Sequence, residues 1–126
     1  MAKIASEQAS QVESMEGFEG RYEDLGGYTA GFETYFADDD PAPLFAGLPD
    51  DACQCPHWGV VLEGRLVYRF ADGTTDDIRA GEAYYARPGH TPVFFADTRI
   101  VEFSPTAELA QTMQVVLRNL SAMQGA

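Results

Sequence analysis

The most reactive side chains of this sequence gather in the segment Cys53-Gln-Cys-Pro-His57, where Cys53, Cys55 and His57 occupy alternate positions. In an extended strand alternate side chains point to the same face, so these three would project together. Thiolate sulfur and imidazole nitrogen are the ligands that zinc prefers. His90 is the only other histidine of the chain. Cys53, Cys55, His57 and His90 are therefore the candidate metal ligands.

A second interpretation is that these side chains only fill the core. Cysteine is among the residue types most often buried and packs as a small hydrophobe. Pro56 bears on the ligand set as well, because a proline interrupts a strand ladder and would turn Cys55 away from its neighbours. Two ligand sets are therefore possible: all four residues, or Cys53, His57 and His90 without Cys55.

Short strands separated by tight turns must position these residues. Alternating or continuous apolar residues predict strands over 28–36, 58–63, 66–70, 83–86, 93–95 and 99–103. Glu63-Gly64 and Asp72-Gly73 are turn signals between them. Many short strands at this spacing are typical of an antiparallel sandwich or barrel, which makes the chain all-β.

A helix is predicted to follow the last strand. Ser104 would be its N-cap and Pro105 its first residue, and Leu109, Met113 and Leu117 lie on its apolar stripe. The 126 residues then form one domain with three parts: a polar N-terminal arm over 1–27, the barrel over 28–104 and the helix over 105–126.

Net charge excludes some partners. The chain has 8 basic and 20 acidic residues and a net charge of −12. Binding to nucleic acid or to an anionic membrane surface needs clustered lysine and arginine, so neither is an expected partner. No apolar run approaches the roughly 18 residues of a membrane span, and the N-terminus lacks the pattern of a signal peptide. With two cysteines expected to stay reduced, we expect a cytoplasmic protein.

The region from Cys53 to Pro105 resembles the cupin superfamily of small jelly-roll β-barrels. The first cupin motif, H-x-H-(x)3–4-E-(x)6-G, aligns on Gly64. Its glutamate then falls on His57, its second histidine on Cys53 and its first on Asp51. The segment CQCPHWG and a PGHTP turn are also similar to a group of small bacterial single-domain cupins.

The second cupin motif, G-(x)5-P-x-G-x-x-H, aligns on Gly81 and Gly89. Arg87 replaces its proline and Pro92 its metal-binding histidine, while His90 lies two residues earlier. The resemblance implies an antiparallel jelly-roll (cupin) β-barrel with a C-terminal α-helix. It also implies a divalent metal inside the barrel, and because thiolates replace the usual ligands, zinc is expected before nickel or iron.

Two kinds of function fit this resemblance. The first is a metal-binding cupin that binds or acts on a small organic molecule, as a metal-dependent isomerase, dioxygenase or cyclase if it is an enzyme. Residues that could line its pocket are Glu63, Tyr68, Tyr85 and Phe94. The alternative is a non-catalytic barrel that senses a ligand or a metal, with a structural zinc or no metal.

The sequence also bears on the oligomeric state. A small barrel with edge strands and a helix with an apolar stripe commonly buries them against a partner, and two-fold dimers are the commonest oligomers. We expect a homodimer whose interface includes the region 28–36 or the N-terminal arm.

Overall fold

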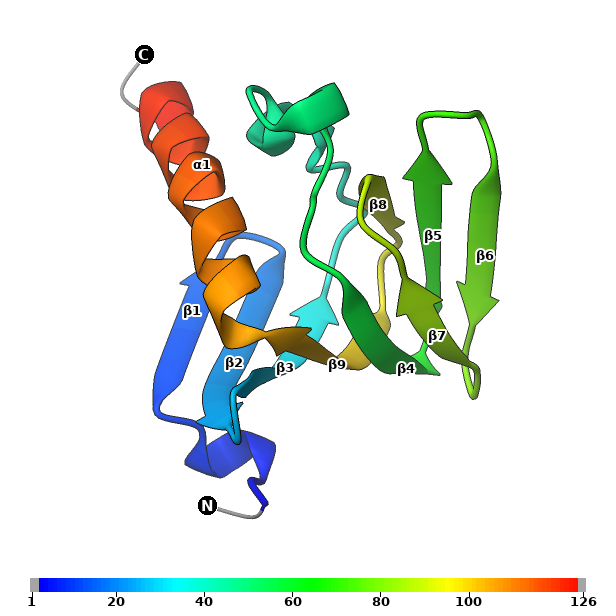
Figure 1. Ribbon diagram of the computed structural model, residues 1–126. Helices are drawn as coiled ribbons and strands as arrows, with labels where there is room; N and C mark the ends of the chain where they lie inside the picture. The colour runs from blue at the N-terminus through cyan, green and yellow to red at the C-terminus, as the bar shows by residue number, and fades with distance from the viewer. Residues whose placement is uncertain (1–2, 125–126) are drawn as a thin grey trace.

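The computed structural model describes residues 3–124 and consists of two antiparallel β-sheets with one helix (Figure 1). The larger sheet has the strand order β1-β2-β3-β9-β4-β7 and the smaller the order β6-β5-β8. The strands are β1 (Gln11–Met15), β2 (Phe18–Leu25), β3 (Tyr28–Tyr35), β4 (His57–Glu63), β5 (Arg65–Phe70), β6 (Thr75–Arg79), β7 (Ala83–Ala86), β8 (His90–Phe94) and β9 (Thr98–Pro105).

The two sheets face each other as a jelly roll, which confirms the predicted fold class. The main core lies between them, and its buried members are Tyr35, Val61, Leu66, Tyr68, Ile78, Ala86, Phe94 and Ile100. Both predicted turns are present: β4 and β5 meet at Gly64, which has φ +83°, and β5 and β6 meet at Gly73, which has φ +87°. Glycine adopts this left-handed conformation without steric cost.

A second, smaller core lies under the helix α1 (Thr106–Gln124). The proline-rich connector before β4 forms two short 3-10 helices, η2 (Ala42–Phe45) and η3 (Pro49–Asp51), and η2 packs on α1. The buried residues of this second core are Phe45, Cys53, Cys55 and Val116. The side-chain amide of Asn119 donates to the Leu44 and Ala46 carbonyl oxygens at 2.8 Å each, which ties the helix to the connector.

The expected N-terminal arm is instead part of the larger sheet. Residues 11–25 form β1 and β2, which pair with each other and with β3, and a short 3-10 helix, η1 (Ser6–Gln8), precedes them. These strands were not apparent from the sequence because they lie at the edge of the sheet and bury little. In β1 the side chains are exposed except for half-buried Glu13, so apolar and polar residues do not alternate. Residues 1 and 2 lie outside the described residues.

The helix starts one residue later than predicted. Ser104 and Pro105 belong to β9, and the described helix runs from Thr106 to Gln124, so residues 125 and 126 of the expected span lie outside the described residues. Ser104 does not cap the helix because its buried hydroxyl bonds His57 instead. Leu117, expected on the packed stripe, is 52% exposed. Among the described residues, no helix is both long and apolar enough to cross a membrane.

Gly59 of β4 provides a test of how tightly the barrel is packed. A Cβ atom there would lie 2.6 Å from the Tyr84 hydroxyl and 2.6 Å from the carbonyl oxygen of Val101. The second neighbour is backbone of the adjacent strand and cannot rotate away. We therefore expect Gly59→Ala to lower the free energy of unfolding by about 2–3 kcal/mol in urea denaturation.

Gly73→Ala is the matched control for this substitution. A Cβ atom added at Gly73 would have no heavy atom within 4 Å, so alanine there meets only the cost of the left-handed conformation, about 1 kcal/mol. Equal losses of stability in the two variants would contradict the close packing inferred at Gly59.

Candidate metal centre

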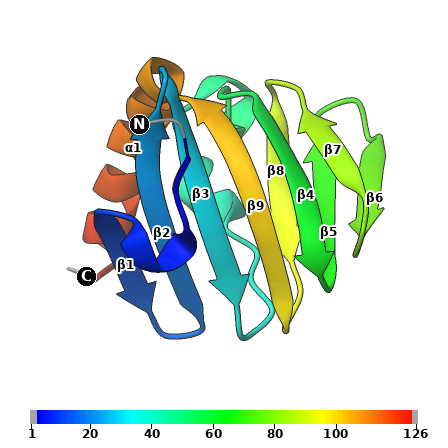
Figure 2. The ribbon, with the colours of Figure 1, turned by 90° about the horizontal axis from the view of Figure 1, so that it is seen from below.

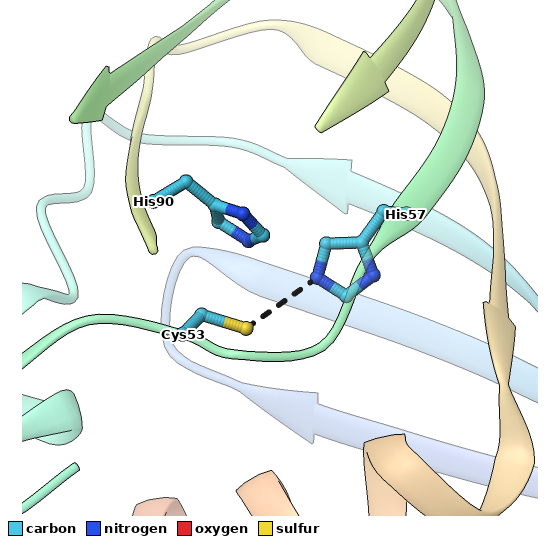
Figure 3. Close-up of side chains that lie close together, drawn as sticks. All are labelled: Cys53, His57 and His90. Atoms are coloured by element: carbon cyan, nitrogen blue, oxygen red, sulfur yellow. Dashed lines mark hydrogen bonds between the residues drawn. The ribbon is translucent and has the colours of Figure 1, made fainter. Parts of the chain in front are cut away.

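The side chains of Cys53, His57 and His90 come together and face a common space (Figure 3). One potential ligand atom from each side chain lies within 4.8 Å of those of the other two. The Cys53 Sγ atom is 3.6 Å from His57 Nε2, and the two imidazole ring centres are 4.9 Å apart. Three of the four predicted ligands therefore form a single cluster.

Backbone pairing brings these residues together from distant parts of the chain. His57 is the first residue of β4 in the larger sheet, and His90 is the first residue of β8 in the smaller one. Cys53 lies in the connector and joins β8 through an antiparallel bridge, in which its N–H donates to the His90 carbonyl oxygen at 2.8 Å. The Gly89 N–H donates in return to the Cys53 carbonyl oxygen at 2.8 Å.

Both imidazole rings are held through Nδ1. His90 Nδ1 lies 2.6 Å from the carbonyl oxygen of Arg87. A carbonyl oxygen only accepts, so Nδ1 carries the proton and Nε2 keeps its lone pair. His57 Nδ1 lies 2.7 Å from the Ser104 hydroxyl, while its Nε2 faces Cys53. Metal-binding histidines are commonly oriented in this way by a partner on the second nitrogen.

Burial sets the protonation of the cluster. His57 is 7% exposed, His90 1% and Cys53 4%. Burial lowers the pKa of His57 to about 4, and burial together with the neighbouring His57 lowers the pKa of His90 to about 4. Burial raises the pKa of the Cys53 thiol to about 12. At neutral pH the metal-free cluster is thus two neutral imidazoles and one protonated thiol.

The distances fit a tetrahedral metal. With bonds of about 2.0–2.3 Å, ligand atoms around zinc lie roughly 3.3–3.8 Å apart. The separation of Cys53 Sγ and His57 Nε2 is already in this range, and the other ligand-atom separations, all within 4.8 Å, would shorten by at most about 1 Å to complete a three-ligand arrangement. A Cys-His-His set of this kind leaves one position of the tetrahedron for a non-protein ligand.

Cys55 is not brought into the cluster. Its thiol donates to the Pro56 carbonyl oxygen at 3.5 Å, and its side chain is packed in the core beneath α1 with Phe45 and Val116. Strand β4 begins only at His57, and Cys53 pairs separately with His90, so Cys53, Cys55 and His57 do not lie on one continuous strand as the sequence suggested. The expected common projection is therefore corrected to a set of three residues, Cys53, His57 and His90.

A largely buried carboxylate beside the centre was not predicted from the sequence. Glu102 of β9 accepts hydrogen bonds from the Tyr68 and Tyr84 hydroxyls at 2.7 Å each. Its other oxygen lies 3.7 Å from His57 Nδ1. Burial raises the pKa of Glu102. The alternation of Ile100, Glu102 and Ser104 was the available signal, because it places a carboxylate on the inward face of a strand.

A second carboxylate lies on the neighbouring strand β3. Glu33 accepts a hydrogen bond from the Tyr22 hydroxyl at 2.6 Å and one from the Tyr35 hydroxyl at 3.5 Å. Burial, and then the charge of Glu102, raises the pKa of Glu33 to about 8. The interior beside the cluster is therefore lined by acids and phenols.

The four residues expected to line a pocket lie in different surroundings. Glu63 is exposed and forms an ion pair with Arg99 at 3.2 Å. Tyr68 is buried and bonds Glu102, and Phe94 is buried and stacks on Tyr35 with ring centres 3.8 Å apart. Tyr85 is 51% exposed and lines a surface hollow. They do not form one pocket, because the strands that carry them turn these side chains toward different faces.

Two surface hollows lie among the described residues, and neither is lined by the cluster. The larger, of about 330 Å³, opens between β6 and β7, and the smaller, of about 150 Å³, lies beside Arg21 and Leu62. Tyr84 links the larger hollow to the centre, because it lines the hollow and its hydroxyl donates to Glu102 beside His57.

Comparison with known proteins gives matches in structure but not in sequence. No protein-family model matches the sequence, and no curated protein matches it. An RmlC-like cupin from Shewanella frigidimarina NCIMB 400 is similar at a TM-score of 0.55, with 16% identity over 81% of this chain and 88% of that one. Hydroxypropylphosphonic acid epoxidase from S. wedmorenis is similar at a TM-score of 0.56, with 11% identity over 82% of this chain and 58% of that one.

A putative ethanolamine utilization protein Q from Salmonella typhimurium LT2 is also similar, at a TM-score of 0.50 and 16% identity over 75% of this chain and 78% of that one. At identities this low, likeness in structure concerns the fold and not the activity. Together with the two antiparallel sheets and the C-terminal helix, these similarities show that the chain has the cupin fold.

Proposed function

We propose that this protein is a metal-binding cupin in which Cys53, His57 and His90 hold one divalent ion. The observation that carries the proposal is the arrangement of the ligand atoms. Cys53 Sγ and His57 Nε2 face each other at 3.6 Å, and the Nδ1 atoms of both histidines are bonded elsewhere, which leaves Nε2 for the metal. A core histidine that served only packing would not need this shared orientation.

Zinc is the metal that the ligand chemistry favours. One thiolate and two imidazoles form a borderline-soft set, which suits zinc better than a site of histidines and a carboxylate would. Nickel and iron accept imidazole as well, and the thiolate of Cys53 is the ligand that shifts the preference toward zinc. Glu102 lies on the Nδ1 side of His57, where a carboxylate orients the ring rather than binding the ion.

A small organic molecule is the proposed occupant of the remaining coordination position. Three protein ligands leave room for one more, as in catalytic zinc sites. The bound ion would supply a Lewis acid there. The chain's own contribution is the row of Tyr84, Glu102 and His57, which leads from the hollow between β6 and β7 to the centre.

A closed metal site is the second candidate, and burial of the cluster favours it. Each of the three ligand residues is less than a tenth exposed, and neither hollow reaches them. In this case the ion would stabilise the barrel or report metal supply, and no organic molecule would bind to it. The fourth position would then hold water enclosed by the protein.

Cobalt substitution distinguishes the two candidates. Cobalt(II) in place of zinc gives a visible spectrum that depends on coordination number and ligand type. If a small ligand reaches the metal, adding free imidazole changes this spectrum at constant pH. A spectrum that is unaffected by added imidazole, with a thermal midpoint that rises on metal binding, would favour the closed site.

Metal content tests the proposal directly. We expect protein purified without a histidine tag to contain one zinc per chain by elemental analysis. His57→Ala and His90→Ala should each lose stoichiometric zinc, because two remaining protein ligands do not hold the ion against dilution. The cobalt form of the unchanged chain should show a thiolate-to-metal charge-transfer band that is absent in Cys53→Ala.

Cys55→Ala is the matched control, because Cys55 is a buried cysteine two residues from Cys53 but lies outside the cluster. This variant should keep its zinc and its charge-transfer band. Zinc lost equally from Cys55→Ala and Cys53→Ala, or no zinc in the unchanged chain after refolding with the metal, would contradict the proposed centre.

The pH dependence of zinc affinity follows from the protonation of the cluster. Imidazoles with a pKa of about 4 are already neutral at pH 6, whereas a thiol with a pKa of about 12 must release its proton to bind the metal. Affinity should therefore rise about tenfold per pH unit between about pH 6 and about pH 8, in competition titrations with a chelator whose own pH dependence is known.

Cys53→Ala should bind zinc only weakly, and the weak binding that remains should lack this slope because the variant has no thiol proton to release. Histidines with ordinary pKa values near 6.5 would instead make the slope steeper below that pH. A slope near zero in the unchanged chain would show that the thiol is not a ligand.

A further inference from the structure

The outer face of the larger sheet carries two continuous uncharged rows of side chains. Because residues paired across antiparallel strands lie on the same face, the strand register defines these rows. One row is Ala30, Phe103, Trp58 and Tyr85, and the next is Phe32, Val101, Val60 and Ala83. They cross β3, β9, β4 and β7 and contain no charged residue.

Most of these two rows is uncovered in the described chain, although Ala30 is buried and Ser6 lies near Phe32 at the β3 end. Figure 2 looks onto this face: β3, β9, β4 and β7 are open, the N-terminal segment passes over β2, and α1 lies on the opposite side of the sheet. Trp58 is 41% exposed, Tyr85 51% and Phe103 40%. The Trp58 ring contacts Tyr28 and Tyr85 with ring centres 6.0 Å and 5.1 Å away, which forms an aromatic ridge.

The exposed area lies in the upper part of the range for a monomer. With Val60 and Leu62, which are 38% and 46% exposed, the aromatic side chains of this face leave about 500 Å² of surface in water. The largest apolar patch of a typical monomer is about 300–600 Å². A standard interface takes about 800 Å² from each partner, so this face with its rim is large enough for one.

Both arginines at the rim are neutralised within the chain. Arg21 forms an ion pair with Glu19 at 2.6 Å, and Arg99 forms one with Glu63 at 3.2 Å. A chain of net charge −12 repels its own copies over most of its surface. The centre of this face is uncharged. Next to its rows lie Arg21, which is paired with Glu19, and Glu23, which accepts a hydrogen bond from the Ser10 N–H. A partner attracted by the chain's acidity would be basic, and these rows offer it no carboxylate.

We propose that this face binds the same face of a second copy of the chain and forms a two-fold dimer. A two-fold axis places each apolar row against the corresponding face of the other copy, so one surface is its own complement. Two sheets packed in this way interdigitate their side chains about 10 Å apart, as in a β-sandwich. The Trp58 ridge would lie at the centre of the interface. This proposal does not depend on the metal centre.

Sedimentation equilibrium of the full chain tests the assembly. We expect a dimer at tens of micromolar that dissociates on dilution. Trp58 is the only tryptophan, so its fluorescence reports this face alone. Its emission should shift to shorter wavelength as the dimer forms, over the same concentration range as the change in mass. A monomer at about 100 µM, or a dimer that leaves the emission of Trp58 unchanged, would overturn the proposal.

Tyr85→Glu tests the location of the interface. Placing an unpaired carboxylate against the partner should raise the dimer dissociation constant at least about a hundredfold. Leu117→Glu is the matched control, because Leu117 is 52% exposed but lies on α1, away from the sheet. The control should dimerise as the unchanged chain does.

Both variants should keep the circular dichroism spectrum and the urea midpoint of the isolated monomer, since both side chains are half exposed. Dissociation caused by Leu117→Glu but not by Tyr85→Glu would place the interface on the helix and overturn the proposal. Should Tyr85→Glu fail to fold, Val60→Glu on the neighbouring row tests the same interface.

Discussion

The candidate centre depends on the short backbone bridge between Cys53 and His90. The Cys53 N–H donates to the His90 carbonyl oxygen, and the Cys53 carbonyl oxygen accepts from Gly89, each at 2.8 Å. These bonds hold the connector before β4 against the start of β8, although the two residues are 37 positions apart in the sequence. Without them the thiol of the connector would have no fixed position relative to either imidazole.

Burial of this bridge then decides the chemistry. The core under α1 covers the cluster on one side. The acids and phenols of the barrel cover it on the other side. The same desolvation that keeps both histidines neutral opposes ionisation of the thiol. A metal cation overcomes this opposition to ionisation of the thiol, because it stabilises a thiolate and also binds neutral imidazole. The surroundings therefore suit a metal better than they suit a free thiolate.

Strands with a clear alternation were predictable, and edge strands were not. The pattern of β4, β5 and β9 follows from one buried and one outward face, and the turns at Gly64 and Gly73 follow from glycine in the left-handed conformation. β1 and β2 pack too few side chains to leave such a pattern. The prediction of Ser104 as the helix N-cap was also wrong. The Ser104 hydroxyl bonds His57, which is 47 residues away, and capping patterns in the local sequence do not include such distant partners.

The sequence by itself determined the jelly roll and the residue types of the centre. Hydrophobic alternation and turn glycines are local properties. Cys53 and His57 stand at ligand positions of the first motif, and His90 lies two residues before the ligand position of the second. Only the tertiary structure decided which ligand-type residues meet: β4 starts only at His57, after Pro56, and the Cys55 thiol bonds the Pro56 carbonyl oxygen and stays outside the cluster. It alone also placed Glu102 beside His57 and left the rows around Trp58 uncovered, since both depend on which strands lie side by side.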